Sequence, residues 1–471
     1  MPRPPELIFL TINEASKLIQ EGSISPTELV EAHLEWIELT DSSLNSFITL
    51  LHDESLKAAI EAENEIKNGD YRGPLHGIPI GLKDLYSTKG IRTTVGSKIM
   101  EDWVPDYDAG VVEKFIESGS ILMGKLQMHE FAYGPTSENV HYGPAHNPWD
   151  TSRVTGGSSG GSGSAVASGQ CMLALGTDTG GSVRIPSALC GIVGLKPTFG
   201  LVSRYGVFPL SYSLDTVGPI TRTVRDNALV MNSIVGHDSR DPSSSFGPFL
   251  DYTSLLDKDV SGIRLAVPRE HFFDLVDFEV KQSFDQALSV LENIGMEIDE
   301  VSIPMLNEVT SIATAITAVE GVEVHLSNLR DRYEDYDPQV RDRLELGLFI
   351  TGPQYVTAQR ARVALSNQIE QVLCTYDAIV TPTIPVSAPK IGQTLVDIRG
   401  SLVKRVDVLP RLTRPFNLFG GPSITIPCGS DSNNLPIGLQ ISGKHFEDAM
   451  VLQIANAFEN ATSWHQRHPK L

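Results

Sequence analysis

The chain has few cysteines, no long apolar run and a deficit of positive charge. Only 4 of its 471 residues are cysteines, and none form the C-x-x-C spacing of zinc and redox sites. All four lie among apolar or small residues, which predicts reduced, buried thiols at Cys171, Cys190, Cys374 and Cys428. The 58 acidic against 37 basic residues give a net charge of −21. This balance argues against nucleic acid or an anionic membrane as a direct partner, since both attract clustered Lys and Arg.

The longest apolar run near the N-terminus is Leu7–Leu10, which is too short for a signal peptide. No stretch approaches the ~20 apolar residues that a spanning helix needs, so we expect a cytoplasmic protein. The glycine-rich stretch 155–186 contains no G-x-G-x-x-G pattern, and no lysine follows the G-x-x-x-x-G match that begins at Gly156. We therefore expect neither a nucleotide cofactor nor a metal.

Short apolar runs alternate with helical patterns along most of the chain, which predicts an α/β fold. Residues 73–125 show the order strand, helix, strand, typical of a βαβ unit with parallel pairing. The alternation continues beyond a loop rich in Ser, Asp and Pro at 239–248, which argues against a separate domain. We expect one domain over 1–471, with N-terminal helices at 1–70, a core at 71–240 and the rest of the sheet and its covering helices at 241–471. The strand order stays open.

Two glycine-serine clusters flank an apolar run within residues 155–186. A flexible linker would continue into polar sequence, whereas the first cluster leads directly into apolar residues, so it belongs to a folded core. Gly156–Gly160 also satisfies G-x-S-x-G, the nucleophile elbow of α/β-hydrolases, but residues 148–153 before it do not read as the required apolar strand. An esterase of that class, with His237 or His325 as base, stays an alternative.

The motifs GGSSGG at 156–161, DTGGSVR at 178–184 and GIPIGLKD at 77–84 together resemble the amidase signature family. The resemblance implies a Ser-cisSer-Lys triad of Lys83, Ser158 and Ser182, with a cis peptide bond before Ser158. It also implies one α/β/α layered domain built on a large mixed central sheet. Lys125 ends the next apolar run and is the rival base when the resemblance is set aside.

Amide cleavage needs an activated nucleophile, a proton for the leaving nitrogen and stabilised charge on oxygen. In the pattern that this chain resembles, neutral Lys83 takes a proton from Ser158, which takes one from the nucleophile Ser182, and an acyl-enzyme forms. A lysine is neutral at pH 7 only when burial lowers its pKa from ~10.4. Successive backbone N–H groups would form an oxyanion hole at Thr179, Gly180, Gly181 and Ser182, with Asp178 and Arg184 expected to pair and fix this turn.

The family resemblance places the substrate wall at 130–135, with contacts from Ala132, Tyr133 and Gly134, and at 412–422. The only charge in the second segment is Arg414, with no carboxylate to receive an ammonium group. We therefore expect neutral apolar or aryl amides, and possibly carbamates (a urethanase) and esters, as small-molecule substrates of a monomer or homodimer. The alternatives are the glutaminase component of a glutamyl-tRNA(Gln) amidotransferase and a non-catalytic binding protein. Arg343 and Asp407 lie outside this wall in sequence.

Overall fold

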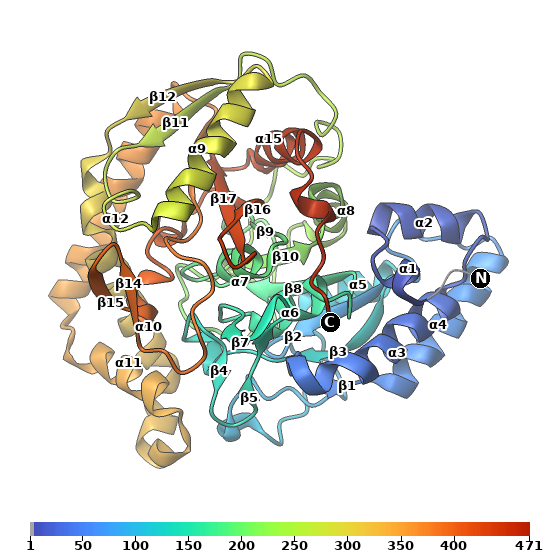
Figure 1. Ribbon diagram of the computed structural model, residues 1–471. Coiled ribbons are helices and arrows are strands. Elements are labelled where there is room, and N and C mark those ends of the chain that lie inside the picture. Colours follow the sequence, from blue (N-terminus) through green and yellow to red (C-terminus); the bar gives the residue numbers. More distant parts are fainter. Residues whose placement is uncertain (1–3) are drawn as a thin grey trace.

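The computed structural model of the protein describes residues 4–471. One large sheet runs through it, and its strands, in spatial order, are β1 (Phe47–Leu50), β3 (Ile121–Leu126), β2 (Pro79–Lys83), β8 (Leu173–Thr177), β10 (Val217–Thr221), β9 (Val193–Lys196), β16 (Ser423–Ser430), β17 (Pro436–Gly443), β13 (Ala378–Pro382), β11 (Arg264–Pro268) and β12 (Glu297–Val301). β2 pairs in parallel with β3 and β8, and β11 with β12 and β13, while the other pairs are antiparallel. The predicted mixed sheet is confirmed (Figure 1).

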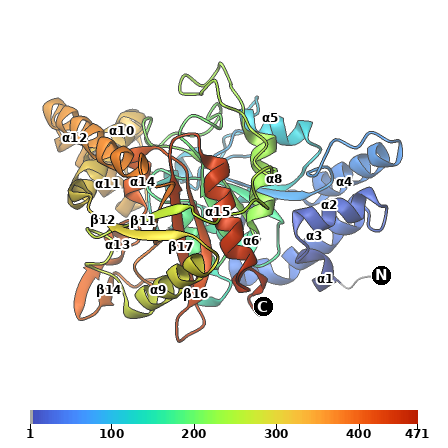
Figure 2. The same ribbon diagram turned by 90° about the horizontal axis from the view of Figure 1, so that it is seen from above.

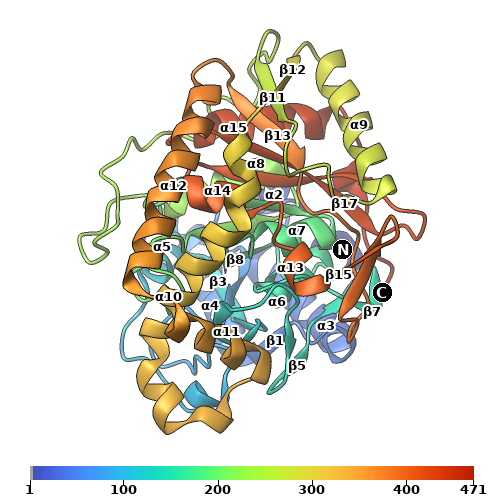
Figure 3. The ribbon, with the colours of Figure 1, turned by 90° about the vertical axis from the view of Figure 1, so that its left-hand side faces the viewer.

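Helices flank this sheet, and their bounds are α1 (Pro4–Ile8), α2 (Ile12–Gln20), α3 (Pro26–Leu44), α4 (His52–Lys67), α5 (Gly110–Glu117), α6 (Gly160–Ala167), α7 (Arg184–Cys190), α8 (Val224–Ile234), α9 (Phe278–Asn293), α10 (Val309–Asp331), α11 (Pro338–Phe349), α12 (Gly352–Leu373), α13 (Arg405–Val408), α14 (Arg414–Phe419) and α15 (Asp448–Asn460). α8 and α15 pack against each other and against the middle of the sheet, as seen from above in Figure 2. The helices α10, α11 and α12 form a separate stack beside the sheet (Figure 3).

Local sequence signals account for several of these elements. The Ser25–Glu28 capping box begins α3 with Pro26 in its first turn. β2, β8 and β10 are buried along their whole length, because neighbouring strands and helices cover them. Three two-stranded sheets complete the structure: β4 (Glu138–Asn139) with β5 (Gly143–Pro144), β6 (His146–Asn147) with β7 (Asp150–Val154), and β14 (Leu395–Ile398) with β15 (Ser401–Lys404).

The structure also bears on two predictions about the wider chain. Of the four free cysteines, three are buried, but Cys374 is exposed, so the expectation of four buried thiols was wrong at that position. It follows α12 directly, where its helix face turns to solvent. Within residues 4–471, no helix combines the length and apolar character that a membrane crossing requires.

Candidate active site

Lys83 and Ser158 meet at the C-terminal edge of the central parallel strands. Lys83 is the last residue of β2, and its Nζ lies 2.7 Å from Ser158 Oγ. The same nitrogen donates to Thr177 Oγ1 at 2.9 Å, and Thr177 ends the adjacent parallel strand β8. Thr177 was missed in the sequence, although parallel strands that end at one edge bring their last side chains together.

The backbone at Ser158 places its hydroxyl between this lysine and the following turn. The Gly157–Ser158 peptide bond is cis. A Cβ on Gly157 would lie 2.8 Å from the backbone of Gly134, Thr136 and Ser137, so only glycine fits this close approach. Ser159 N–H donates to the Ser182 carbonyl at 3.3 Å, which joins the two serine clusters through the backbone.

Ser182 faces a cavity with its hydroxyl free. Its Oγ has no hydrogen-bond partner among residues 4–471, and Ser182 lines the cavity together with Thr179 and Gly180. In the same described part of the chain, the N–H groups of Thr179, Gly180 and Ser182 also lack partners. The Gly181 N–H, by contrast, donates to Asp178 Oδ1 at 2.9 Å, so three of the four expected oxyanion donors are free in this geometry.

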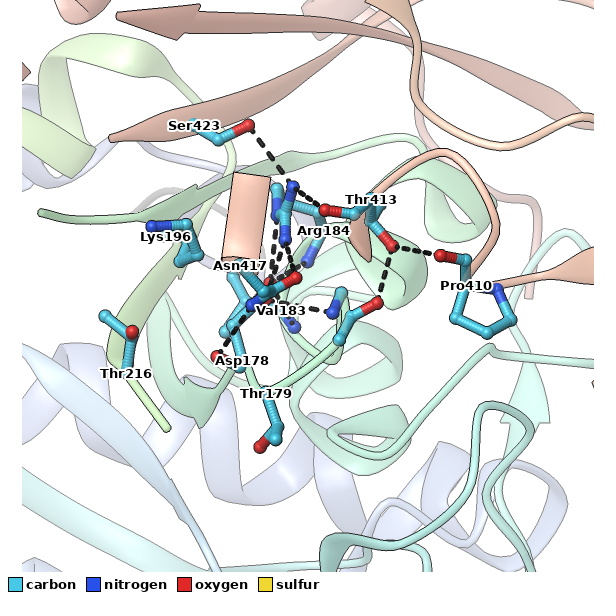
Figure 4. Close-up of polar contacts among 12 residues, drawn as sticks. Asp178, Thr179, Val183, Arg184, Lys196, Thr216, Pro410, Thr413, Asn417 and Ser423 are labelled. Carbon is cyan, nitrogen blue, oxygen red and sulfur yellow. Dashed lines mark hydrogen bonds and ion pairs between the residues drawn. The ribbon is translucent and has the colours of Figure 1, made fainter. Parts of the chain in front are cut away.

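A buried ion pair fixes this turn, as expected. Arg184 Nη2 donates to Asp178 Oδ1 at 2.8 Å, and both side chains are fully buried. Asp178 Oδ2 accepts the Val183 N–H at 3.1 Å, so one carboxylate holds the turn from inside. The guanidinium also reaches Asn417 Oδ1 at 2.7 Å and the Thr413 carbonyl at 3.0 Å (Figure 4). The network ties the turn to the segment around α14, more than two hundred residues away in sequence.

Burial changes the protonation of the two rival lysines, and their contacts separate them. Desolvation lowers the pKa of Lys83 to about 7, although Asp215 and Asp178 oppose the shift. Desolvation likewise lowers the pKa of Lys125 to about 8, against the Asp84 carboxylate. Lys125 Nζ donates to the Tyr86 carbonyl and to Thr93 Oγ1, both at 2.6 Å, and it contacts no serine. Of these two lysines, Lys83 is the one within hydrogen-bond distance of a serine hydroxyl.

The cavity at Ser182 has a volume of about 200 Å³. The three expected contact residues line it on one side: Ala132, Tyr133 and Gly134. Gly134 is required there, because a Cβ at this position would lie 2.1–2.4 Å from the His129 ring. The apolar lining of the cavity also includes side chains from several distant segments: Pro135, Ile185, Leu210, Leu346, Val406 and Pro410.

Charged side chains from segments that are distant in the sequence also line the cavity. Arg343 of α11 and Asp407 of α13 line it together with Arg414, so the cavity holds a carboxylate that the segment 412–422 lacks. Arg343 Nη1 donates to the Tyr133 carbonyl at 2.6 Å. The Arg414 guanidinium forms no hydrogen bond or ion pair with any other residue in the described range 4–471 and is available to an anion. Burial lowers the pKa of Arg414, and Tyr133 and Asp407 oppose that shift.

Neither histidine required by the elbow alternative contacts Ser158. His325 Nδ1 lies 3.0 Å from Tyr336 Oη, and burial lowers its pKa to about 4. His237 stacks on the Phe246 ring at 4.0 Å. The strand before Gly156, β7, ends at Val154 and is polar and largely exposed rather than the apolar strand that the elbow requires. β7 pairs with β6, bridges from Arg153 to Lys390 and lies outside the large sheet, so it does not present a nucleophile at the top of that sheet.

The lysine, the serines and the backbone donors together form a set of groups suited to amide cleavage. They provide a base of lowered pKa, a hydroxyl that faces a cavity and free N–H groups beside it. No cluster of three or more His, Cys, Asp or Glu within residues 4–471 is arranged to hold a metal ion.

Comparison with known proteins places the whole chain in one family. The family model for amidase matches residues 28–452. The A subunit of glutamyl-tRNA(Gln) amidotransferase from Carboxydothermus hydrogenoformans is 38% identical, over 99% of this chain and 100% of the relative. The solved structure of the same protein from Thermotoga maritima is 37% identical, with a TM-score of 0.81 over 96% of this chain and 95% of that one.

A second solved structure has a TM-score of 0.93 at 33% identity, over 98% of this chain and 100% of that chain. It is described as a vestigial protein complex that reveals the evolutionary origins of an s-triazine catabolic enzyme. Both structures share the fold over nearly their full length, and the family match spans the lysine strand, both serine clusters and the C-terminal strands. The chain thus belongs to the amidase signature family of amide-cleaving hydrolases.

Proposed function

We propose that this chain hydrolyses the terminal amide of a substrate that also carries a carboxylate, with glutamine as the first candidate. The observation that carries the proposal is the set of charges in the cavity: Arg414 without a partner among residues 4–471, Arg343 and Asp407. An α-amino acid presents a carboxylate and an ammonium group, and burying either one unpaired is costly. Two guanidinium groups and one carboxylate in the same cavity suit such a substrate.

In the proposed mechanism, Lys83 is the base, Ser158 the relay and Ser182 the nucleophile. Neutral Lys83 accepts the Ser158 proton, Ser158 Oγ accepts the Ser182 proton, and Ser182 Oγ attacks the amide carbon. The developing oxyanion accepts hydrogen bonds from the Thr179, Gly180 and Ser182 N–H groups. The relay then returns a proton to the leaving nitrogen, ammonia departs, and water hydrolyses the acyl-enzyme by the same route. The free Ser182 Oγ in the cavity and the 2.7 Å lysine contact support these roles.

The relatives that are named as the A component of glutamyl-tRNA(Gln) amidotransferase favour glutamine as an ammonia donor, with companion subunits and tRNA as partners. We propose this role for the chain ahead of a stand-alone hydrolase. The apolar residues that line much of the cavity support the second candidate, an amidase for neutral apolar or aryl amides and carbamates.

A matched set of substrates separates these candidates. L-Glutamine, glutaramate and pentanamide carry the same terminal primary amide on a chain of five carbons, and differ by the ammonium group and then by the carboxylate. We expect kcat/KM to fall from glutamine to glutaramate and to fall further for pentanamide. Arg414→Met should raise KM for the first two substrates only, and Asp407→Asn should raise KM for glutamine only. Turnover of pentanamide at the rate of glutamine would contradict the proposal and favour the apolar amidase.

The proposed role in a larger complex has its own test. The purified chain should be assayed for glutaminase activity alone and then with companion amidotransferase subunits and glutamyl-tRNA(Gln). A rise in glutamine turnover on addition would support the role. Unchanged turnover, with no complex on size-exclusion chromatography, would assign the chain to the stand-alone hydrolases.

A further inference from the structure

A buried carboxylate that plays no part in the proposed relay contacts the turn 178–182, which carries the proposed nucleophile Ser182. Asp215 is 7% exposed, and its Oδ1 accepts the Thr179 hydroxyl at 2.5 Å. Its Oδ2 accepts the backbone N–H groups of Leu210 at 2.8 Å and Ser211 at 3.0 Å. Within residues 4–471 no Lys, Arg or His side chain forms an ion pair with it. Both oxygens are therefore committed to neutral donors, each bond strengthened by the charge.

These contacts join two walls of the cavity. Thr179 and Leu210 both line it, and Asp215 is bonded to both. Figure 4 shows the Thr179 hydroxyl pointing away from the Arg184 network, so Thr179 is held from the side opposite to Asp178. The Asp178 N–H also donates to the Thr216 carbonyl at 2.8 Å, which gives the two segments a second link.

The segment that carries Asp215 is itself anchored to the helical stack. Glu320 of α10 accepts the Ser211 hydroxyl at 2.5 Å and the Ser213 N–H at 3.0 Å. The same helix supplies Thr314 and Thr317 to the cavity lining. A displacement of α10 or of the 209–216 segment would therefore reach Thr179 through Asp215.

We propose that Asp215 is a positioning residue that holds Thr179, and with it the free Thr179 and Gly180 N–H groups, in the orientation that receives the oxyanion. The proposal rests on the assignment of Ser182 as nucleophile under the proposed function. The threonine suits this role because its branched side chain has few rotamers, so fixing its hydroxyl also fixes the peptide groups on either side. Oxyanion donors act only when they are already aligned with the developing charge.

The charge of Asp215 gives the proposal a second readout. Two carboxylates, Asp215 and Asp178, raise the pKa of Lys83 against the effect of burial. Asp178 is paired with Arg184. The Asp215 carboxylate has no ion-pair partner within residues 4–471; Arg204 donates to its backbone carbonyl at 3.3 Å. Burial raises the pKa of Asp215, and the Thr179 hydroxyl and the Arg204 charge oppose that shift. The nearby His129 is neutral at working pH, because burial lowers its pKa to about 3. Removing the Asp215 charge should therefore lower the pKa of Lys83 and move the acid limb of the rate profile to lower pH.

The test compares Asp215→Asn, Thr179→Val and the double variant by the rate at which a fluorophosphonate labels Ser182, together with kcat and KM. Labelling reports the nucleophile and the oxyanion donors without depending on the natural substrate. We expect each single variant to lose about 10- to 100-fold in labelling rate and in kcat, with KM little changed. This loss should not exceed the loss caused by removing an oxyanion donor itself. The double variant should lose no more than either single one, because both substitutions act on the same contact between Thr179 and Asp215. Thr179→Ser should restore most of the rate.

A matched control keeps this result specific. Asp448 is also a buried carboxylate that accepts a threonine hydroxyl, from Thr198 at 2.6 Å, and a backbone N–H at 2.9 Å. Asp448→Asn should leave the labelling rate and the acid limb unchanged in the folded protein. Only Asp215→Asn should shift the acid limb. Additive losses in the double variant, unchanged labelling in Asp215→Asn, or an equal loss in Asp448→Asn would overturn the proposal.

The same measurements separate this proposal from the proposed function. Wild-type protein that is labelled at Ser182 but does not turn over glutamine or glutaramate would contradict the substrate assignment, and the labelling rates would still test Asp215. Wild-type protein labelled at another residue would overturn the nucleophile and the role of Asp215 together.

Discussion

The lowered pKa of Lys83 predicts the shape of the pH profile. Activity should follow the neutral fraction of this lysine, because only the unprotonated amine accepts a proton. With a pKa of about 7 in the folded protein, that fraction is about 9% at pH 6 and about 91% at pH 8. kcat/KM should therefore rise about tenfold over this interval and then level off. A lysine at its ordinary pKa of ~10.4 would give about a 100-fold rise with no plateau, so the two cases are distinguishable.

The assay is the release of ammonia from a primary amide between pH 5.5 and 9, in buffers of constant ionic strength. Lys83→Met should lose most of the activity and keep its fold by circular dichroism. The matched control is Lys125→Met, which removes another buried lysine whose Nζ contacts the Tyr86 carbonyl and no serine. In this variant the acid limb should stay at the wild-type pH. A flat profile, a 100-fold rise without plateau, or loss of the limb in Lys125→Met alone would refute the assignment of Lys83 as base.

Three further outcomes follow from the geometry. Arg184→Met should leave the buried Asp178 carboxylate without its ion partner and lower the free energy of unfolding by about 3–5 kcal/mol, which urea denaturation would measure; an unchanged midpoint would contradict the importance of this pair. Gly134→Ala should place a methyl group against the His129 ring and reduce kcat/KM at least tenfold by displacing the cavity wall, and wild-type kinetics would show that the wall yields. Incubation with EDTA should leave activity unchanged, and its loss, with recovery on adding a divalent metal, would contradict a mechanism based on lysine and serine alone.

Much of the local structure was predictable because short-range rules decide it. The capping box at Ser25 and Glu28 is a local sequence signal for the start of α3, and the apolar runs at 263–267 and 378–382 are local signals for β11 and β13. The missed elements are short or polar. β1 has four residues shortly after a helix that ends in a left-handed Asn45, and β7 is a polar strand outside the large sheet. β7 lacks the apolar pattern by which strands are recognised, whereas β1 is apolar but too short to be told from the ends of the flanking helices by periodicity.

In the candidate site, too, the sequence decided some features and the tertiary structure decided others. The sequence by itself determined which residue types are present for the chemistry, since the motifs around Lys83, Ser158 and Ser182 are contiguous stretches that identify the family. It could not determine that Lys83 rather than Lys125 reaches a serine, because both lysines lie at the C-terminal ends of adjacent parallel strands. The strand order and the register, which places Lys125 beside Leu82 and Lys83 beside Leu126, give the two lysines different neighbours. The sequence also could not show which charged side chains line the cavity, because Arg343, Asp407 and Arg414 belong to three different helices. Electrostatic fit depends on distances in space, and only the packing of α11, α13 and α14 around the central sheet sets those distances.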